Sequence, residues 1–149
     1  MFDGQVIYRQ YQDDADRSYV CASWIKSLRS DRWADDKPES RDTYNGRLID
    51  RLLAVPDTLI FIACLADEPD TIVGYCVGSR VNAGARSSVL HFVYVRKQRR
   101  REGIARRLLQ WCDVKESSAL VHTFQTSAVN FIKHRFPTSV YVDPESFLE

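Results

Sequence analysis

The residues best suited to chemistry form a short basic segment that ends in a glycine. Seven of the twelve residues from Arg96 to Arg107 are arginine or lysine, and Gly103 stands three positions after Arg100. The segment lies between an apolar run at 89–95 and an amphipathic stretch that begins at Gly103. A helix start attracts phosphate through its unpaired N–H groups and its positive dipole end, and arginines add charged donors. The spacing therefore predicts a phosphate-binding turn.

Two small residues support this prediction. Gly103 has no Cβ at the point where the backbone would approach an anion closely, and Ala105 keeps the next turn open. His91, in the apolar run before the turn, is the other reactive candidate, since the ordinary pKa of histidine lies near neutrality. A histidine packed inside a strand is the alternative interpretation of His91.

The elements that would position these residues follow from apolar periodicity and from turn residues. Strands are predicted at 5–11, 58–66, 71–79, 89–95, 119–124 and 139–142. Four helices are predicted. The first begins at Asp13, which we expect to cap it, and the second includes the stretch around Leu48 to Leu53. The third runs from Gly103 to about Lys115 and the fourth from Ser127 to Arg135. Gly74 inside a strand indicates a bulge or a close approach of two backbones. The order of elements predicts an α/β (α+β) fold with a mixed sheet.

Composition limits the class of protein. The 149 residues, with 44% hydrophobic residues and a net charge of +1, are typical of one soluble domain, 1–149, and not of a polycation that coats nucleic acid. The four cysteines lie far apart without a CxxC pair, so we expect buried free thiols and no metal site. No leader pattern and no apolar stretch of about 18 residues stands out, which predicts a cytoplasmic protein without a membrane span.

The turn resembles the motif of the GNAT superfamily of N-acetyltransferases, R/Q-x-x-G-x-G/A after a strand. Arg100, Gly103 and Ala105 match that spacing. Val93-Tyr94-Val95 is similar to the end of the preceding family strand, and Ile72-Val73-Gly74-Tyr75 is similar to an earlier family strand. The order of elements matches over nearly the whole chain.

The resemblance implies a mostly antiparallel central sheet with two splayed parallel strands, flanked by about four helices. It also implies that acetyl-coenzyme A is the co-substrate and that an acetyl group passes to a primary amine of a small molecule or a protein. Pantetheine would pair with the backbone of Val93 and Val95. The pyrophosphate would sit on the turn formed by Arg100, Arg101, Glu102, Gly103, Ile104 and Ala105.

The resemblance is less complete for the catalytic groups. The family often has a tyrosine acid in its last helix, and aligning Phe136 with the family phenylalanine places Phe131 at the tyrosine position. Phenylalanine cannot donate a proton, so either another group such as Tyr141 or water serves as the acid, the helix is offset, or the chain does not catalyse. His91 would face the acceptor amine and act as the base, directly or through water.

The acceptor and the partners remain open at this point. Acidic and aromatic residues occur in the region that walls the acceptor pocket in the superfamily, although the first three could simply begin a helix: Asp13, Asp14, Asp16, Trp33, Asp35, Asp36 and Tyr44. The alternative function is a catalytically inactive protein of the same fold that binds coenzyme A, nucleic acid or a protein partner through residues 96–107. The near-zero net charge disfavours nucleic acid. The oligomeric state is left open, a homodimer included.

Overall fold

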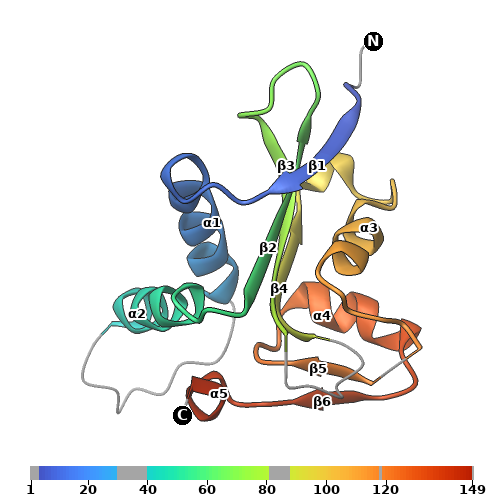
Figure 1. Ribbon diagram of the computed structural model, residues 1–149. Coiled ribbons are helices and arrows are strands. Elements are labelled where there is room, and N and C mark those ends of the chain that lie inside the picture. The colour runs from blue at the N-terminus through green and yellow to red at the C-terminus, as the bar shows by residue number, and fades with distance from the viewer. Residues whose placement is uncertain (1–3, 30–39, 81–87, 118, 149) are drawn as a thin grey trace.

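The computed structural model describes residues 4–29, 40–80, 88–117 and 119–148 of the chain. These residues form one six-stranded sheet in the order β1-β2-β3-β4-β5-β6. Helices α1 and α2 cover one face of the sheet, and α3 and α4 cover the other (Figure 1). A mixed sheet between two layers of helices confirms the predicted fold class.

The first four strands form the antiparallel part of the sheet. They are β1 (Val6–Gln10), β2 (Thr58–Leu65), β3 (Ile72–Ser79) and β4 (Val89–Val95). Strand β3 is buried along its whole length, because it lies between two neighbours and under helices on both faces. This explains why it reads as a continuous apolar run and not as an alternating one.

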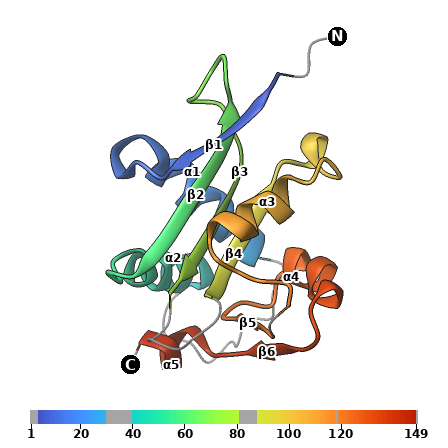
Figure 2. The same cartoon turned by 45° about the vertical axis from the view of Figure 1, so that its right-hand side comes forward.

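The last two strands are short and parallel to β4. They are β5 (Leu120–His122) and β6 (Ser139–Tyr141). In the described residues β5 pairs with β4 at Leu90–His122, near the beginning of β4. Figures 1 and 2 show that β5 and β6 then turn away from β4. The two parallel strands are therefore splayed, as the family resemblance implied.

The helices of the described residues number five, one more than expected. They are α1 (Asp13–Leu28), α2 (Arg41–Leu53), α3 (Ile104–Trp111), α4 (Ser127–Ile132) and α5 (Pro144–Leu148). Helix α3 ends before the predicted Lys115. A 3₁₀ turn, η2 (Lys133–Arg135), continues α4 over the rest of its predicted span. None of the helices that the structure describes has the length and apolar character needed to cross a bilayer.

The start of α1 differs from the prediction that Asp13 caps it. Gln12 occupies the cap position without a side-chain cap bond, and Asp13 is the first residue of the helix. The carboxylate of Asp16 instead accepts the Gln12 N–H at 2.7 Å and two bonds from Arg9 at 2.7 and 2.9 Å. Burial alone would raise the pKa of Asp16, but these hydrogen bonds lower it. Asp16 thereby ties α1 to β1.

Gly74 confirms the predicted close approach of two backbones. A Cβ at this position would lie 2.6 Å from the carbonyl oxygen of Tyr94 and 3.3 Å from the Cα of Val95. A bulge also lies directly beside Gly74, because Gly74 pairs with Ala63 while Cys64 pairs with Ile72, which leaves Val73 as an extra residue of β3. A second bulge lies between Val77 and Gly78. At the second bulge His91 is an extra residue of β4 without a partner on β3, so the alternation of side chains between the two faces of β4 shifts by one residue there.

The cysteines agree with the expectation of free thiols, with one difference. Cys64, Cys76 and Cys112 are buried, but Cys21 on α1 is only half-buried. Burial raises the pKa of Cys76. These three buried thiols are core residues in this fold.

Candidate active site

The second half of β4 has a backbone edge that no described strand covers. The N–H of Arg96 bonds the carbonyl of Val73 on β3 at 2.8 Å. Because successive residues of a strand point their N–H and C=O groups to opposite sides, those of Val93 and Val95 point away from β3. They face the region that β5 leaves beyond Leu90. Val93 and Val95 therefore lie on the open edge of β4 in the described structure.

The turn after β4 holds its shape through its own residues. A 3₁₀ turn, η1 (Lys97–Arg99), follows the strand. Arg99 bonds Glu102 and the carbonyl of Gly4, so the Glu102 side chain serves the turn itself. Arg101 and Gly103 both have left-handed backbones, with φ of 70° and 81°.

Gly103 leaves open space where a side chain would otherwise project. A Cβ built on Gly103 meets no heavy atom within 4 Å, and the residue is exposed. The first helical bond of α3 runs from the N–H of Arg107 to the carbonyl of Gly103 at 3.1 Å. The preceding N–H groups, including those of Ile104 and Ala105, therefore have no partner within the helix. Ile104 is buried and anchors this helix start to the core.

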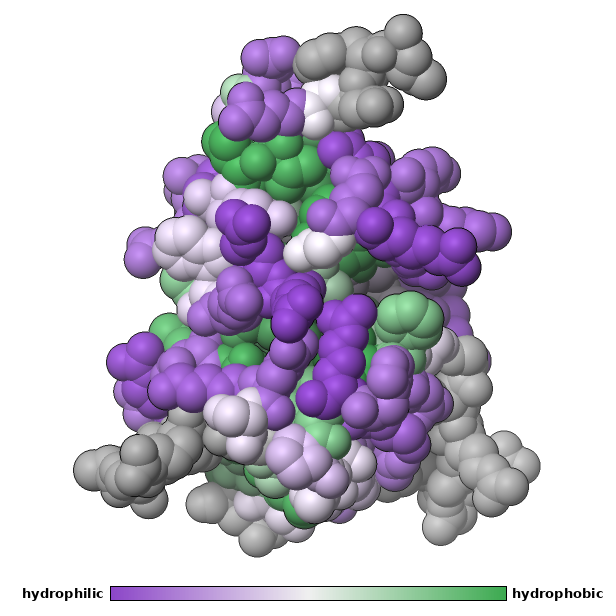
Figure 3. Space-filling model, turned by 90° about the vertical axis from the view of Figure 1, so that its right-hand side faces the viewer, coloured by the Kyte–Doolittle hydropathy of each residue, from purple (hydrophilic) through white to green (hydrophobic). Residues whose placement is uncertain are grey.

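The basic residues of the turn divide into two groups. Four of them are engaged by other side chains: Arg96 by Tyr19, Arg99 by Glu102 of the same turn, Arg106 by Glu116, and Arg107 by the ring of Tyr8. Lys97, Arg100 and Arg101 are exposed and form no ion pair with a described carboxylate. The Nε of Arg100 donates to the carbonyl of Val95 at 2.9 Å, which leaves its terminal nitrogens available. The face that carries α3 and α4 is largely hydrophilic (Figure 3).

The structure places His91 differently from the expectation that it faces an acceptor. Its imidazole is fully buried, with Nε2 2.7 Å from the Ser79 hydroxyl and Nδ1 2.7 Å from the Thr123 hydroxyl. Its ring packs edge-on against Phe147 of α5 at 4.9 Å. Burial lowers the pKa of His91 to about 3. Both nitrogens are engaged, so in this arrangement His91 cannot accept a proton from a bound amine.

The residues considered for the acid lie near the other end of the sheet. Tyr141 on β6 is 47% exposed and packs near His122, with ring centroids 5.9 Å apart. Phe131 on α4 is 63% exposed and contacts His134, whereas Phe136 is buried in the core. The structure does not bring Tyr141 and His91 into contact with the turn. The role of Tyr141 stays a prediction.

The expected acceptor wall is described only in part. Trp33, Asp35 and Asp36 lie outside the described residues. Asp13 accepts bonds from Tyr11 and Arg17 and begins α1, whereas Asp16 in the same first turn accepts bonds from Arg9 and Gln12. The hydroxyl of Tyr44 donates to Glu145, and burial and this carboxylate raise the pKa of Tyr44 to about 12. These groups are committed to internal contacts.

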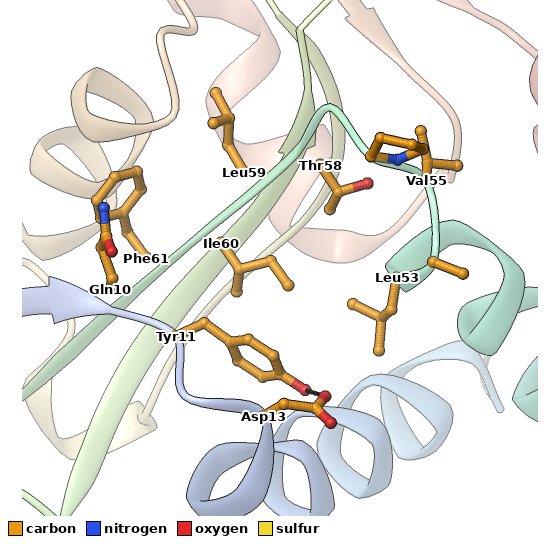
Figure 4. Close-up of a pocket in the computed structure, with 11 residues that line it drawn as sticks. Gln10, Tyr11, Asp13, Leu53, Val55, Thr58, Leu59, Ile60 and Phe61 are labelled. Atoms are coloured by element: carbon orange, nitrogen blue, oxygen red, sulfur yellow. Dashed lines mark hydrogen bonds between the residues drawn. The ribbon is translucent and has the colours of Figure 1, made fainter.

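A surface pocket of about 520 Å³ lies away from the turn. Figure 4 shows that residues of β1, α1, α2 and β2 line it, with Tyr11 and Asp13 on one side and Leu53 and Ile60 near them. Its lining residues include no part of β4 or of the turn. In the described residues no three histidine, cysteine or acidic side chains gather to hold a metal.

A row of side chains on the far face of β4 escaped the sequence interpretation. Phe92 and Tyr94 on β4 and Arg96 just after it alternate along the chain and point toward α1, where Trp24 stacks on Phe92 and Tyr19 contacts Tyr94 and Arg96. The only signal in the sequence is that alternation, which becomes meaningful once the face of β4 is known.

Comparison with known proteins agrees with this geometry. A family model described as the Acetyltransferase (GNAT) family matches residues 12–136. A candidate acetyl transferase from Pyrococcus furiosus is 17% identical with a TM-score of 0.57, covering 88% of this chain and 91% of that chain. A possible acetyltransferase from Clostridium difficile 630 is 15% identical with a TM-score of 0.52, covering 85% and 84%.

A further structural match concerns a larger protein. The glucosamine N-acetyltransferase region of a fungal multi-domain β-N-acetylglucosaminidase aligns with 76% of this chain at 18% identity, with a TM-score of 0.47. This chain spans 13% of that protein. No curated protein sequence matches the chain. The matches above a TM-score of 0.5 show the fold, and the family model spans the open edge of β4, the turn and α3. The chain belongs to the GNAT family of acetyltransferases.

Proposed function

We propose that this protein is an acetyl-coenzyme A-dependent N-acetyltransferase that acts on a primary amine of a small molecule or a protein. One observation carries the proposal. Backbone groups without a described strand or helix partner run from the open edge of β4 at Val93 and Val95 to the start of α3 behind Gly103. An extended amide-containing arm that ends in a pyrophosphate matches such a path.

The residues present fit coenzyme A. The amide groups of pantetheine would pair with Val93 and with the N–H of Val95, whose carbonyl already accepts from Arg100. The pyrophosphate would be held near Gly103, where no Cβ occupies the open space. Helix N–H groups and the helix dipole would stabilise the phosphates there, and Arg100 and Arg101 would supply charged donors.

The reaction also requires groups that transfer protons to the leaving thiolate and from the attacking amine. When bound, acetyl-coenzyme A supplies a thioester that an uncharged amine can attack directly. Phe131 carries no proton, so Tyr141 or water is the proposed donor to the leaving thiolate. His91 is occupied by Ser79 and Thr123, and we therefore assign the removal of the ammonium proton to water.

The distribution of basic residues favours one pyrophosphate over a nucleic-acid track. Lys97, Arg100 and Arg101 lie at one helix start, and the other basic side chains of this segment are engaged with Tyr8, Tyr19, Glu102 or Glu116. A nucleic-acid backbone presents a long series of charges and needs a matching series of contacts. The cluster is too compact for that role.

Calorimetry with coenzyme A tests the site. Gly103→Val should abolish measurable binding, because a branched side chain fills the space next to the turn. The left-handed backbone also costs the folded variant about 1–2 kcal/mol, so its fold must be checked by circular dichroism. Gly46→Ala on α2, where a Cβ meets only Ile25 Cδ1 at 3.6 Å, is the control and should bind normally. Unchanged affinity in Gly103→Val would contradict the site.

The same assay separates the two candidate functions. Arg100→Ala should weaken coenzyme A binding about tenfold or more, the scale of charge-assisted bonds to phosphate. Thiol release from acetyl-coenzyme A with a library of amines then measures turnover. Binding without turnover of any amine would favour the catalytically inactive alternative. Tight, salt-dependent binding to random DNA that coenzyme A does not displace would favour nucleic acid.

A further inference from the structure

Arg96 differs from the other basic residues of its segment in the face that it occupies. The side chains of a strand alternate, and Val95 belongs to the core beneath α3, so Arg96 points to the opposite face. Its Nε donates to the hydroxyl of Tyr19 on α1 at 3.2 Å, and its guanidinium lies 5.5 Å from the centre of that ring. Arg96 is therefore not part of the phosphate-binding turn.

Tyr19 is held in place by neighbouring rings. It packs against Tyr75 at 6.2 Å and against Tyr94 at 6.4 Å between ring centroids. Tyr75 is fully buried, and its hydroxyl lies 2.6 Å from the Ser23 hydroxyl and donates to the Val20 carbonyl at 3.0 Å. Tyr19, Tyr94 and Arg96 remain partly exposed above this support. We call these three residues the Arg96 surface.

The Arg96 surface carries a positive charge that no described carboxylate balances. Several other partly buried or exposed arginines of the described residues pair with acids, for example Arg9 with Asp16 and Arg29 with Asp42. Arg96 bonds a neutral hydroxyl instead, and its terminal nitrogens have no recorded acceptor in the described chain. A half-buried cation without a counter-charge is costly, and an anion that binds it offsets the cost.

The chemistry of the surface suits a carboxylate. A guanidinium edge offers two parallel N–H donors that match the two oxygens of a carboxylate. Burial raises the pKa of Tyr19, so its hydroxyl stays protonated while its oxygen accepts from Arg96. One guanidinium balances a single negative charge, which a carboxylate has and a phosphate dianion exceeds.

The position of the surface connects it with the proposed reaction. Arg96 directly follows Val95 on β4, so a ligand there lies beside the proposed pantetheine edge but on the face away from α3. We propose that Arg96, with Tyr19 and Tyr94, binds a carboxylate of the acceptor, and that the acceptor is an amine that also carries a carboxylate. This inference rests on the proposed N-acetyltransferase function.

The geometry of the strand also indicates the distance between the amine and the carboxylate of the acceptor. Val93 lies three residues before Arg96, which corresponds to about 10 Å along an extended strand. An amine that reaches the thioester near Val93 must then be several bonds away from a carboxylate held at Arg96. This spacing points to ω-amino acids and to lysine, and not to the α-amine of a short amino acid.

Paired probes with and without the carboxylate test the inference. The pairs are 6-aminohexanoate with hexylamine, and lysine with 1,5-diaminopentane, titrated into the protein by calorimetry in the presence and absence of coenzyme A. We expect the wild-type protein to bind the carboxylate member at least tenfold more tightly, and Arg96→Met to remove this difference. Arg51→Met removes an exposed positive charge on α2 and should behave as wild type.

Further variants and the coenzyme separate this inference from the proposed function. Arg96→Lys keeps the charge but loses the paired donors, so it should retain only part of the preference. Coenzyme A affinity should stay within twofold of wild type in Arg96→Met. A preference that survives Arg96→Met, equal binding of both members of each pair, or a loss of coenzyme A affinity as large as in Arg100→Ala would overturn the inference. Failure of the wild-type protein to bind coenzyme A would instead overturn the proposed function.

Discussion

Replacing His91 with asparagine should make the stability of the protein much less dependent on pH between 7 and 5. In the folded protein His91 is neutral, because burial lowers its pKa to about 3. In the unfolded chain a histidine takes up a proton below about pH 6.5. The unfolded state therefore binds more protons as the pH falls, and stability is lost between pH 6.5 and pH 3. Asparagine does not titrate and removes this contribution.

The expected size of the effect follows from the two pKa values. Each pH unit below 6.5 costs the folded state up to about 1.4 kcal/mol, which amounts to about 2 kcal/mol between pH 7 and pH 5. At pH 7 the variant should itself be less stable by about 1–2 kcal/mol, because asparagine cannot replace both bonds to Ser79 and Thr123. The stabilities of the two proteins should therefore converge near pH 5.

Urea unfolding at pH 7, 6 and 5 measures this convergence. The free energy of unfolding comes from linear extrapolation at each pH. His134→Asn is the matched control, because the His134 side chain is exposed on η2 and its replacement should leave the wild-type pH dependence intact. If His91→Asn lost as much stability as wild type between pH 7 and pH 5, the assignment of a buried neutral imidazole would be wrong.

The same variant also tests the catalytic role predicted from the sequence. With both nitrogens engaged inside the fold, His91 should be dispensable for proton transfer, and His91→Asn should keep turnover of the wild-type order wherever it is folded. A large fall in kcat with unchanged coenzyme A affinity, together with loss of the acidic limb of the rate profile, would restore His91 as the base.

Two further predictions concern β3 and β6. Gly74→Ala should destabilise the protein by about 1–3 kcal/mol, seen as a lower Tm, because the new Cβ would lie 2.6 Å from the Tyr94 carbonyl, whereas Gly46→Ala should cause no such loss. Equal Tm values for both alanine variants would rule out the close contact of β3 and β4. Tyr141→Phe should lower kcat about a hundredfold or more without changing coenzyme A affinity if the hydroxyl protonates the thiolate, and full turnover would remove Tyr141 from the proton path.

Much of the secondary structure could be predicted because it depends on local patterns. The apolar runs at 58–66 and 71–79 became β2 and β3, and the stripe of Val20, Trp24 and Leu28 became the buried face of α1. Helix α5 was missed, since five residues with one proline and two acidic or polar neighbours carry no helical period. Asp13 was assigned as the cap of α1 because its side chain suits that role, but Asp16 bonds the cap residue instead.

The turn was predictable for a similar reason. Gly103 has a left-handed backbone and follows Arg100 by only three residues. Because the two residues are so close in the chain, their spacing alone places them in the same turn. The open edge of β4 was implied by the resemblance, but its extent depends on where β5 departs. That point is set at Leu90 by packing of the parallel strands, and no residue of β4 alone indicates it.

Local order in the chain was thus enough to indicate the strands, most of the helices and the turn that follows β4. The environments of His91 and Arg96 required the folded chain. His91 is neutral because Ser79, Thr123 and Phe147, which come from three other segments, enclose it. Arg96 is set apart from its basic neighbours because α1 brings Tyr19 to the opposite face of β4. Burial and charge balance depend on contacts between residues that are distant in the chain, and such contacts form only when the layers pack together.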